Sequence, residues 1–190
     1  MEYKIIQLDP HNTATLISEY SKLKGTCPNY SNLTMEEFLD CRDSIYAIAD
    51  VYGSFGHCHD TIAIIGIKES TAEDVGIEWM DFYCKPDHKI YSIEFLHYGI
   101  IGTHVNFLGN YVSHTECCMR LIEEALADKN DGFVALKMLC PTGKASDLHD
   151  ALYKSKFTIV NYDPKTETYL YIRMPQMHLH RIDMKDRQLE

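Results

Sequence analysis

Short apolar runs rich in β-branched and aromatic residues fill the middle of the chain, and turn-forming residues separate them. Gly53-Ser54, Lys85-Pro86-Asp87 and Gly102 are such breaks, and connections this short favour antiparallel neighbours. The pattern predicts strands at 44–51, 61–67, 76–83, 89–99 and 103–112, after a first short strand at 3–8.

Apolar residues three or four positions apart mark helical segments before these strands. Asp9-Pro10 is expected to start the first helix, because Asp can cap a helix and Pro fits its first turn, and Gly25 is expected to stop it. Thr34 and Glu37 have the spacing of a capping box, in which each residue bonds the backbone N–H of the other. A second helix is therefore expected to begin there.

The second half of the chain alternates between helical and strand patterns. Ser113 and Glu116 again have the capping-box spacing and predict the start of a helix. The elements expected from there on are a helix at 115–129, a strand at 132–140, a helix at 146–155 and a hairpin of 158–161 with 168–174. The order is β-α-α, an antiparallel meander, then α-β-α-β-β. It predicts an α/β (α+β) fold with a mixed, mostly antiparallel central sheet flanked by helices.

Length and composition fit one globular domain, since 190 residues with 45% hydrophobic content can bury a sizeable core. We place this domain at 1–174, and expect 175–190 to form a charged surface tail because periodicity is lost there. The net charge of −10 is spread along the chain and gives no basic footprint for nucleic acid. Neither a basic amphipathic helix nor an apolar stretch of roughly 20 residues is present, so no membrane contact is expected.

The cysteines indicate a reducing compartment. There are seven, an odd number, and they are scattered without a C-x-x-C pair, which argues against a disulfide framework or a zinc ribbon. The first residues, MEYKIIQLDP, lack the basic and apolar regions of a signal peptide. A soluble, cytoplasmic protein is expected.

Four segments of the second half carry a family pattern. Residues 121–126 (LIEEAL) match a helix that follows a cofactor loop, and residues 133–139 (FVALKML) match the strand after it. Residues 151–157 (ALYKSKF) are similar to an LYxxxGF stretch, and residues 166–174 (TETYLYIRM) to a Tyr-rich last strand. Together with the order of elements, residues 44–174 resemble the GNAT-type N-acetyltransferases.

The resemblance implies transfer of an acetyl group from acetyl-CoA to a primary amine. In the family, pantetheine pairs with strand backbone, and the pyrophosphate lies on backbone N–H groups at the next helix's N-terminus. Aligned on that helix, the resemblance assigns the cofactor contacts to Tyr111, Val112, Ser113, His114, Thr115, Glu116, Cys117 and Cys118. The family's R/Q-x-x-G-x-G/A loop keeps no glycine here, and the Glu116 carboxylate opposes a diphosphate at this place. An ordinary helix cap is the alternative interpretation of the segment.

The resemblance also suggests catalytic residues. Tyr153 corresponds to the family's general acid, which reprotonates the leaving thiolate. The segment from Tyr153 to Phe157 is one residue shorter than in the family, and Lys156 replaces the family's Gly. Glu94 and His97, on an expected central strand, are the candidate general bases. The alternatives are that Tyr153 is an ordinary helix residue and that Glu94 and His97 are sheet-surface residues.

Three hypotheses follow. The first is an N-acetyltransferase that uses acetyl-CoA and a small-molecule or peptide amine, with a homodimer left open. The second is a GNAT-like scaffold that has lost acetyl transfer and binds a partner protein or a small ligand. The third is a metal site on His57 and His59, which can share a strand face; no fourth ligand is visible, so no metal is expected. Cys117 and Cys118 are interpreted as core residues rather than reactive thiols.

Overall fold

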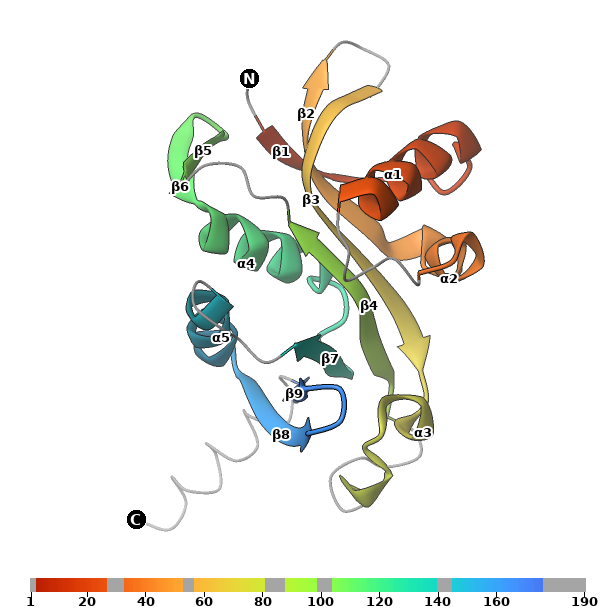
Figure 1. The fold of residues 1–190 in the computed structure, drawn as a ribbon, viewed down its shortest axis with the longest axis vertical. Helices are drawn as coiled ribbons and strands as arrows, with labels where there is room; N and C mark the ends of the chain where they lie inside the picture. The colour runs from red at the N-terminus through yellow and green to blue at the C-terminus, as the bar shows by residue number, and fades with distance from the viewer. Residues whose placement is uncertain are drawn as a thin grey trace. The chain divides into compact units, whose positions relative to one another are not determined.

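The computed structural model describes residues 3–26, 33–52, 57–80, 88–98, 104–139 and 145–175 (Figure 1). The chain forms two compact units. Unit 1 comprises 1–68 and 94–125, and unit 2 comprises 69–93 and 126–190. Strands β3 (His57–Ser70) and β4 (Ile90–Tyr98) contribute residues to both. The expectation of one domain at 1–174 stays a prediction.

Unit 1 contains a sheet in the order β6-β5-β1-β2-β3-β4. Its other strands are β1 (Tyr3–Gln7), β2 (Ile45–Tyr52), β5 (His104–Phe107) and β6 (Asn110–Ser113). The β1–β2, β2–β3 and β5–β6 pairs are antiparallel, whereas β1 and β5 pair in parallel at Tyr3 and Phe107. This register makes β6 and β4 the two outer strands of the unit.

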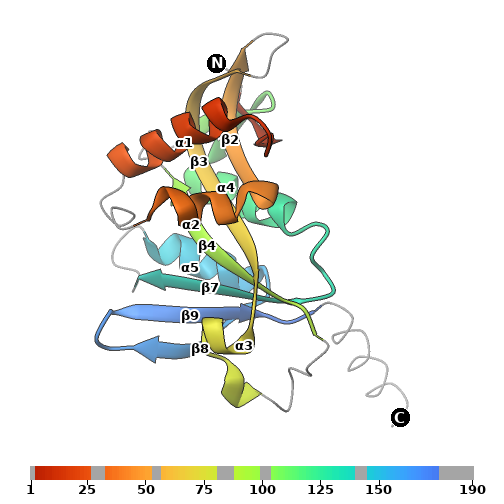
Figure 2. The same ribbon diagram turned by 90° about the vertical axis from the view of Figure 1, so that its right-hand side faces the viewer.

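Helices cover both faces of this sheet (Figure 2). Helices α1 (Thr13–Thr26) and α2 (Met35–Asp40) lie on one face, and α4 (His114–Ala125) lies on the other. The short 3-10 turn η2 (Arg42–Ser44) connects α2 to β2.

The core beneath α1 and α2 is built around aromatic rings. Phe38 stacks on Phe95 with ring centroids 5.4 Å apart, and Tyr20 meets Phe38 edge to face at 5.5 Å. Gly66 allows this packing, because a Cβ there would overlap the Phe95 ring. Burying such a side chain contributes about 1.5–3 kcal/mol, so this cluster anchors both helices. Its buried members are Leu8, Leu16, Tyr20, Leu23, Phe38, Cys41, Ile45, Ala47, Ile64 and Phe95.

Unit 2 contains the strand order β4-β7-β9-β8. Residues 90–93 of β4 pair in parallel with β7 (Phe133–Leu139). Strand β9 (Thr168–Arg173) pairs antiparallel with both β7 and β8 (Phe157–Asp163). Helix α3 (Ala72–Val75) and turn η3 (Glu78–Met80) pack on a cluster that includes Phe133, Leu170 and Ile172.

Helix α5 (Ala145–Lys154) packs against unit 2 through its apolar stripe. Leu148 and Leu152 are buried, and the Nδ1 atom of His149 lies 2.7 Å from the hydroxyl of Tyr171 in a hydrogen bond. Tyr171 alternates along β9 with Leu170 and Ile172, so α5 and α3 contact opposite faces of the strand.

The mixed, mostly antiparallel sheet flanked by helices is confirmed, as is the capping box of Thr34 and Glu37. The strand expected at 76–83 is wrong for 76–80, the part of it that the structure describes. Thr71 and Asp74 form a further capping box that starts α3, and Gly76, at φ 77°, ends it in the left-handed conformation that glycine favours.

The single strand expected at 103–112 is also wrong, because a two-residue turn divides it into β5 and β6. Leu108 and Gly109 both have positive φ, 50° and 79°, as the tightest hairpin turns require. The helix expected at 115–129 ends earlier, at Ala125.

Some expectations fall outside the described residues. They include the turns at 53–54 and 85–87, nearly all of the 175–190 tail, and the side chains of His57, Cys58 and His59. In the part of the chain that is described, no group of three or more His, Cys, Asp or Glu residues could hold a metal ion. No helix within the same ranges has the length and apolarity needed to cross a bilayer.

Candidate functional site

The start of α4 is the place where the sequence predicts cofactor contacts. Strand β6 leads directly into the helix, and Ser113 Oγ accepts a hydrogen bond from the Glu116 N–H at 3.2 Å. Ser113 therefore caps the helix, as its spacing predicts. The first-turn N–H groups and the helix dipole create positive potential at this point, which suits an anion.

An ion pair modifies the charge at this helix start. The Glu116 carboxylate accepts a hydrogen bond from the Arg120 guanidinium at 2.6 Å, one turn further along α4. Arg120 also lies over the ring of Phe107, 5.4 Å from its centroid. Both charged side chains are roughly half exposed, so the pair adds little stability. The Arg120 cation thus offsets the negative charge of Glu116 at the helix start.

The two adjacent cysteines belong to the core. Cys117 and Cys118 are each 1% exposed. Burial raises the pKa of the Cys117 thiol to about 11 and that of Cys118 higher still. Both remain protonated at neutral pH, which confirms the interpretation as core residues. A ligand at this helix start would meet their backbone N–H groups, not their sulfur atoms.

The structure separates two parts of the predicted site. Tyr111, 81% exposed, and Val112, buried, lie on β6 at one edge of the unit 1 sheet. Glu94 and His97 lie on β4 at the other edge, with β5, β1, β2 and β3 between. Helix α4 contacts β6, β5 and β2 as it crosses the face. Thr115 is half-buried, and the side chain of His114 lies outside the described part.

Glu94 and His97 are alternatives rather than partners. They lie three residues apart in β4, so their side chains project from opposite faces of the sheet. Glu94 is exposed and His97 is half-buried. A single amine on one face could therefore meet only one of them.

Strand β4 extends beyond its pairing with β7. The register runs from Ile90 with Phe133 to Ile93 with Leu136, whereas β4 continues to Tyr98. Residues 94–98 belong to unit 1, where β4 is an outer strand.

Tyr153 lies in unit 2, in the last turn of α5, and is 73% exposed. Lys156 stands where the resemblance expects Gly, and its φ of 67° lies in the left-handed region that glycine favours. The Lys156 N–H donates a hydrogen bond to the Tyr153 carbonyl at 3.1 Å and so closes the helix end.

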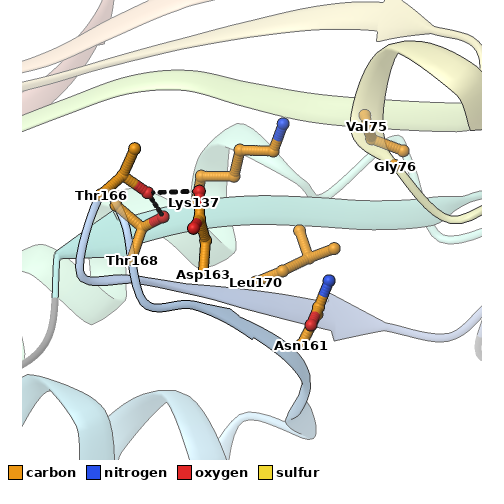
Figure 3. Close-up of a pocket in the computed structure, with 8 residues that line it drawn as sticks. All are labelled: Val75, Gly76, Lys137, Asn161, Asp163, Thr166, Thr168 and Leu170. Atoms are coloured by element: carbon orange, nitrogen blue, oxygen red, sulfur yellow. Dashed lines mark hydrogen bonds between the residues drawn. The ribbon is translucent and has the colours of Figure 1, made fainter.

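Unit 2 also contains a pocket that the sequence does not reveal (Figure 3). It has a volume of about 440 Å³ and lies between α3 and the β7-β9-β8 sheet. Its lining residues are Val75, Gly76, Lys137, Asn161, Asp163, Thr166, Thr168 and Leu170. They come from four separate segments, and no motif links them.

Comparisons with known proteins identify the fold. No protein-family model and no curated protein sequence matches the chain. Among solved structures, the NatC complex bound to Gag peptide and CoA is similar, with TM-score 0.58 and 12% identity, covering 92% of this chain and 99% of that one. Arabidopsis thaliana NAA60 with a bisubstrate analogue has TM-score 0.58 and 13% identity, covering 90% and 97%.

A third structure, an aminoglycoside 6'-acetyltransferase of type Ii, has TM-score 0.53 and 13% identity, covering 88% of this chain and 94% of that one. These matches span nearly the whole length of each protein. Because the sequence identity is low, they establish the fold alone. The chain has the fold of the GNAT N-acetyltransferases.

Proposed function

We propose that this protein transfers an acetyl group from acetyl-CoA to the amine of a small-molecule or peptide acceptor. The observation that carries the proposal is the match over 92% of the chain to a complex that holds CoA and a peptide. The position of β6 supports it, because this outer strand of the sheet carries Tyr111 and Val112, the proposed pantetheine contacts, directly before α4.

In this proposal the chain's residues hold the donor and move two protons. The first-turn N–H groups of α4 and the Ser113 hydroxyl bind the pyrophosphate, and Arg120 offsets Glu116. The amine nitrogen attacks the thioester carbonyl carbon, the C–S bond breaks, and CoA leaves as a thiolate. Glu94 or His97 accepts the amine proton, and Tyr153 donates a proton to the thiolate.

Ligand-induced stabilisation tests the proposal directly. Thermal unfolding is measured with acetyl-CoA, with CoA and with ATP as the control nucleotide. A ligand at roughly 100 times its Kd stabilises the folded state by about 2.7 kcal/mol, which gives an easily measured rise in Tm. We expect a rise with both CoA forms and not with ATP. No rise with either CoA form contradicts the proposal.

A matched pair of variants tests the phosphate contact. Asp and Asn are both good helix caps, so Ser113→Asp and Ser113→Asn keep the helix start intact. Only Ser113→Asp adds a negative charge where the pyrophosphate would lie. The acetyl-CoA shift should persist in Ser113→Asn and fall sharply in Ser113→Asp. Equal acetyl-CoA shifts in Tm for the two variants would show that the pyrophosphate does not bind at the start of α4.

A second candidate function is a scaffold that binds a partner protein or small ligand without acetyl transfer. The specific observation that favours it is the position of β6 and β4 at opposite edges of the unit 1 sheet. That order separates the start of α4, with Tyr111 and Val112 before it, from the candidate bases Glu94 and His97. If neither CoA form shifts the Tm, this candidate replaces the first.

A further inference from the structure

The pocket of unit 2 is the polar continuation of an otherwise apolar sheet face. Helix α3 and turn η3 cover the apolar end of the face, where Phe133 and Ile172 are buried. Toward the C-terminal end of β7 the face changes to Lys137, Asn161 and Asp163, and no described element covers them. The hollow of about 440 Å³ lies over this polar end, a volume typical of a small-molecule site.

The pocket contains opposite charges that do not neutralise each other. Lys137 and Asp163 both line it, yet no ion pair joins them or links Lys137 to another described residue. In Figure 3 the Lys137 side chain extends from β7 toward the α3 end of the pocket, away from the Thr166 and Thr168 hydroxyls. A cation at one end and an anion at the other form a dipolar site.

The carboxylate of Asp163 is fixed in place by its own hairpin. The Lys165 N–H donates to Oδ1 at 2.8 Å, and the Thr166 hydroxyl donates to Oδ2 at 2.8 Å. These bonds lower the pKa of Asp163, so the group is ionised at neutral pH. Each oxygen keeps a further lone pair, and the carboxylate can still accept a bond from a ligand.

A β-bulge directs Asn161 into the same pocket. The β8–β9 register shifts between Ile159 and Asn161, which places Asn161 opposite Leu170 on the pocket face. Asn161 Oδ1 accepts the Tyr162 N–H at 2.8 Å, which leaves the amide nitrogen as the group offered to a ligand. Bulges of this kind commonly re-aim a side chain next to a binding site. Lys137 and Asn161 thus supply donors, and Val75 and Leu170 supply an apolar wall.

We propose that this pocket binds a small zwitterion, an α-amino acid with an apolar side chain. The ligand carboxylate would meet the Lys137 ammonium and the Asn161 amide nitrogen, and its ammonium would meet the Asp163 carboxylate. The side chain would lie on Val75 and Leu170. None of the residues that line this pocket is among those proposed to hold acetyl-CoA or to act in acetyl transfer.

The test uses L-leucine as probe and the full chain without acetyl-CoA, with binding followed by ligand-observed NMR and calorimetry. Leucinamide lacks the carboxylate and 4-methylpentanoate lacks the ammonium, so each removes one half of the match. We expect L-leucine to bind and each analogue to bind roughly tenfold more weakly, as for loss of one charge-assisted hydrogen bond.

Variants assign the two halves. Lys137→Met should weaken the binding of L-leucine and leave the binding of leucinamide unchanged. Asp163→Asn keeps a side-chain oxygen that can accept a hydrogen bond within the turn. It should weaken the binding of L-leucine and leave the binding of 4-methylpentanoate unchanged. Lys154→Met, on α5 outside the pocket, is the matched control and should bind as the wild type does. Absence of L-leucine binding at millimolar concentration, or equal binding of all three compounds, overturns the proposal. Because acetyl-CoA is absent, neither result bears on acetyl transfer.

Discussion

The starts of α2 and α4 have the same sequence spacing and different electrostatics. In α2, the Glu37 carboxylate accepts bonds from the Thr34 N–H at 2.7 Å and from the Thr34 hydroxyl at 2.9 Å. In α4, the Glu116 carboxylate accepts a bond from Arg120 at 2.6 Å. The acid of α2 thus serves the helix end itself, while that of α4 is held by a cation one turn away.

The residue four positions after the acid explains the difference. That position is Arg120 in α4 and the buried Cys41 in α2, so only α4 offers the acid a cation at i+4. A hydroxyl and an acid three residues apart therefore identify a helix start, but they do not show whether that helix start can bind an anionic ligand. Anion binding also depends on whether the next turn of the helix carries a cation that offsets the acid.

The largest effect should come from breaking the α2 box. Thr34→Ala removes the acceptor of the Glu37 N–H and the donor to its carboxylate, and should cost about 1–2 kcal/mol of unfolding free energy. Urea unfolding measures it. Thr34→Ser keeps both bonds and should lose only a small part of that stability; a loss equal to that of alanine would mean that the Thr34 methyl group, not the cap, matters.

A smaller loss is expected at α4. Ser113→Ala removes one cap bond, to the Glu116 N–H, and should cost about 0.5–1 kcal/mol in the same urea experiment. A loss as large as that of Thr34→Ala would show that the two helix starts are equivalent, and the comparison would fail.

Arg120→Met tests the role of the cation at the start of α4. The pair with Glu116 is exposed, so its loss should cost only about 0.3–0.5 kcal/mol of unfolding free energy. The larger consequence should be a reduced acetyl-CoA shift in Tm, since Glu116 is then uncompensated. Lys154→Met, which also removes one exposed positive charge but lies on α5, is the control for a general change in charge. An undiminished acetyl-CoA shift in Arg120→Met would separate Arg120 from the phosphate site.

The smallest effect concerns pH. Hydrogen bonds from the Thr34 backbone and side chain lower the pKa of the Glu37 carboxyl. The stability from these bonds is therefore present above the ordinary Glu pKa and is lost as pH falls through the lowered value. Glu37→Gln should flatten the acid side of a plot of unfolding free energy against pH, whereas Glu36→Gln should not. Identical acid limbs for the two variants would contradict the assignment.

Much of the fold follows from the sequence because it depends on local patterns. Runs rich in β-branched and aromatic residues located β2 and β4, and the capping box of Thr34 located α2. Segment 76–83 misled because its apolar residues also fit a strand, while the capping box before it uses Asp74 in place of Glu. The division of 103–112 depends on the positive φ of Leu108. Because leucine rarely adopts a positive φ, the sequence did not predict a turn at this position.

The site was less predictable because it depends on strand order. The segments 94–97 and 111–118 lie close in sequence. Because β5 pairs with β1, however, β6 lies at the edge of the unit 1 sheet opposite to β4. The unit 2 pocket depends on the bulge before Asn161 and on cross-strand neighbours that no single segment reveals. At Lys156 the sequence lacks the glycine that the resemblance expects, whereas the backbone has the positive φ that glycine favours.

The buried cysteines have a practical consequence for assaying this protein. Burial raises the pKa of Cys41 to about 12, and Cys41, Cys117 and Cys118 are each only 1% exposed. Disulfide reagents react with thiolates, so these three buried thiols, which stay protonated at assay pH, do not react with them. A colorimetric readout of CoA thiol release would therefore carry no background from these three thiols.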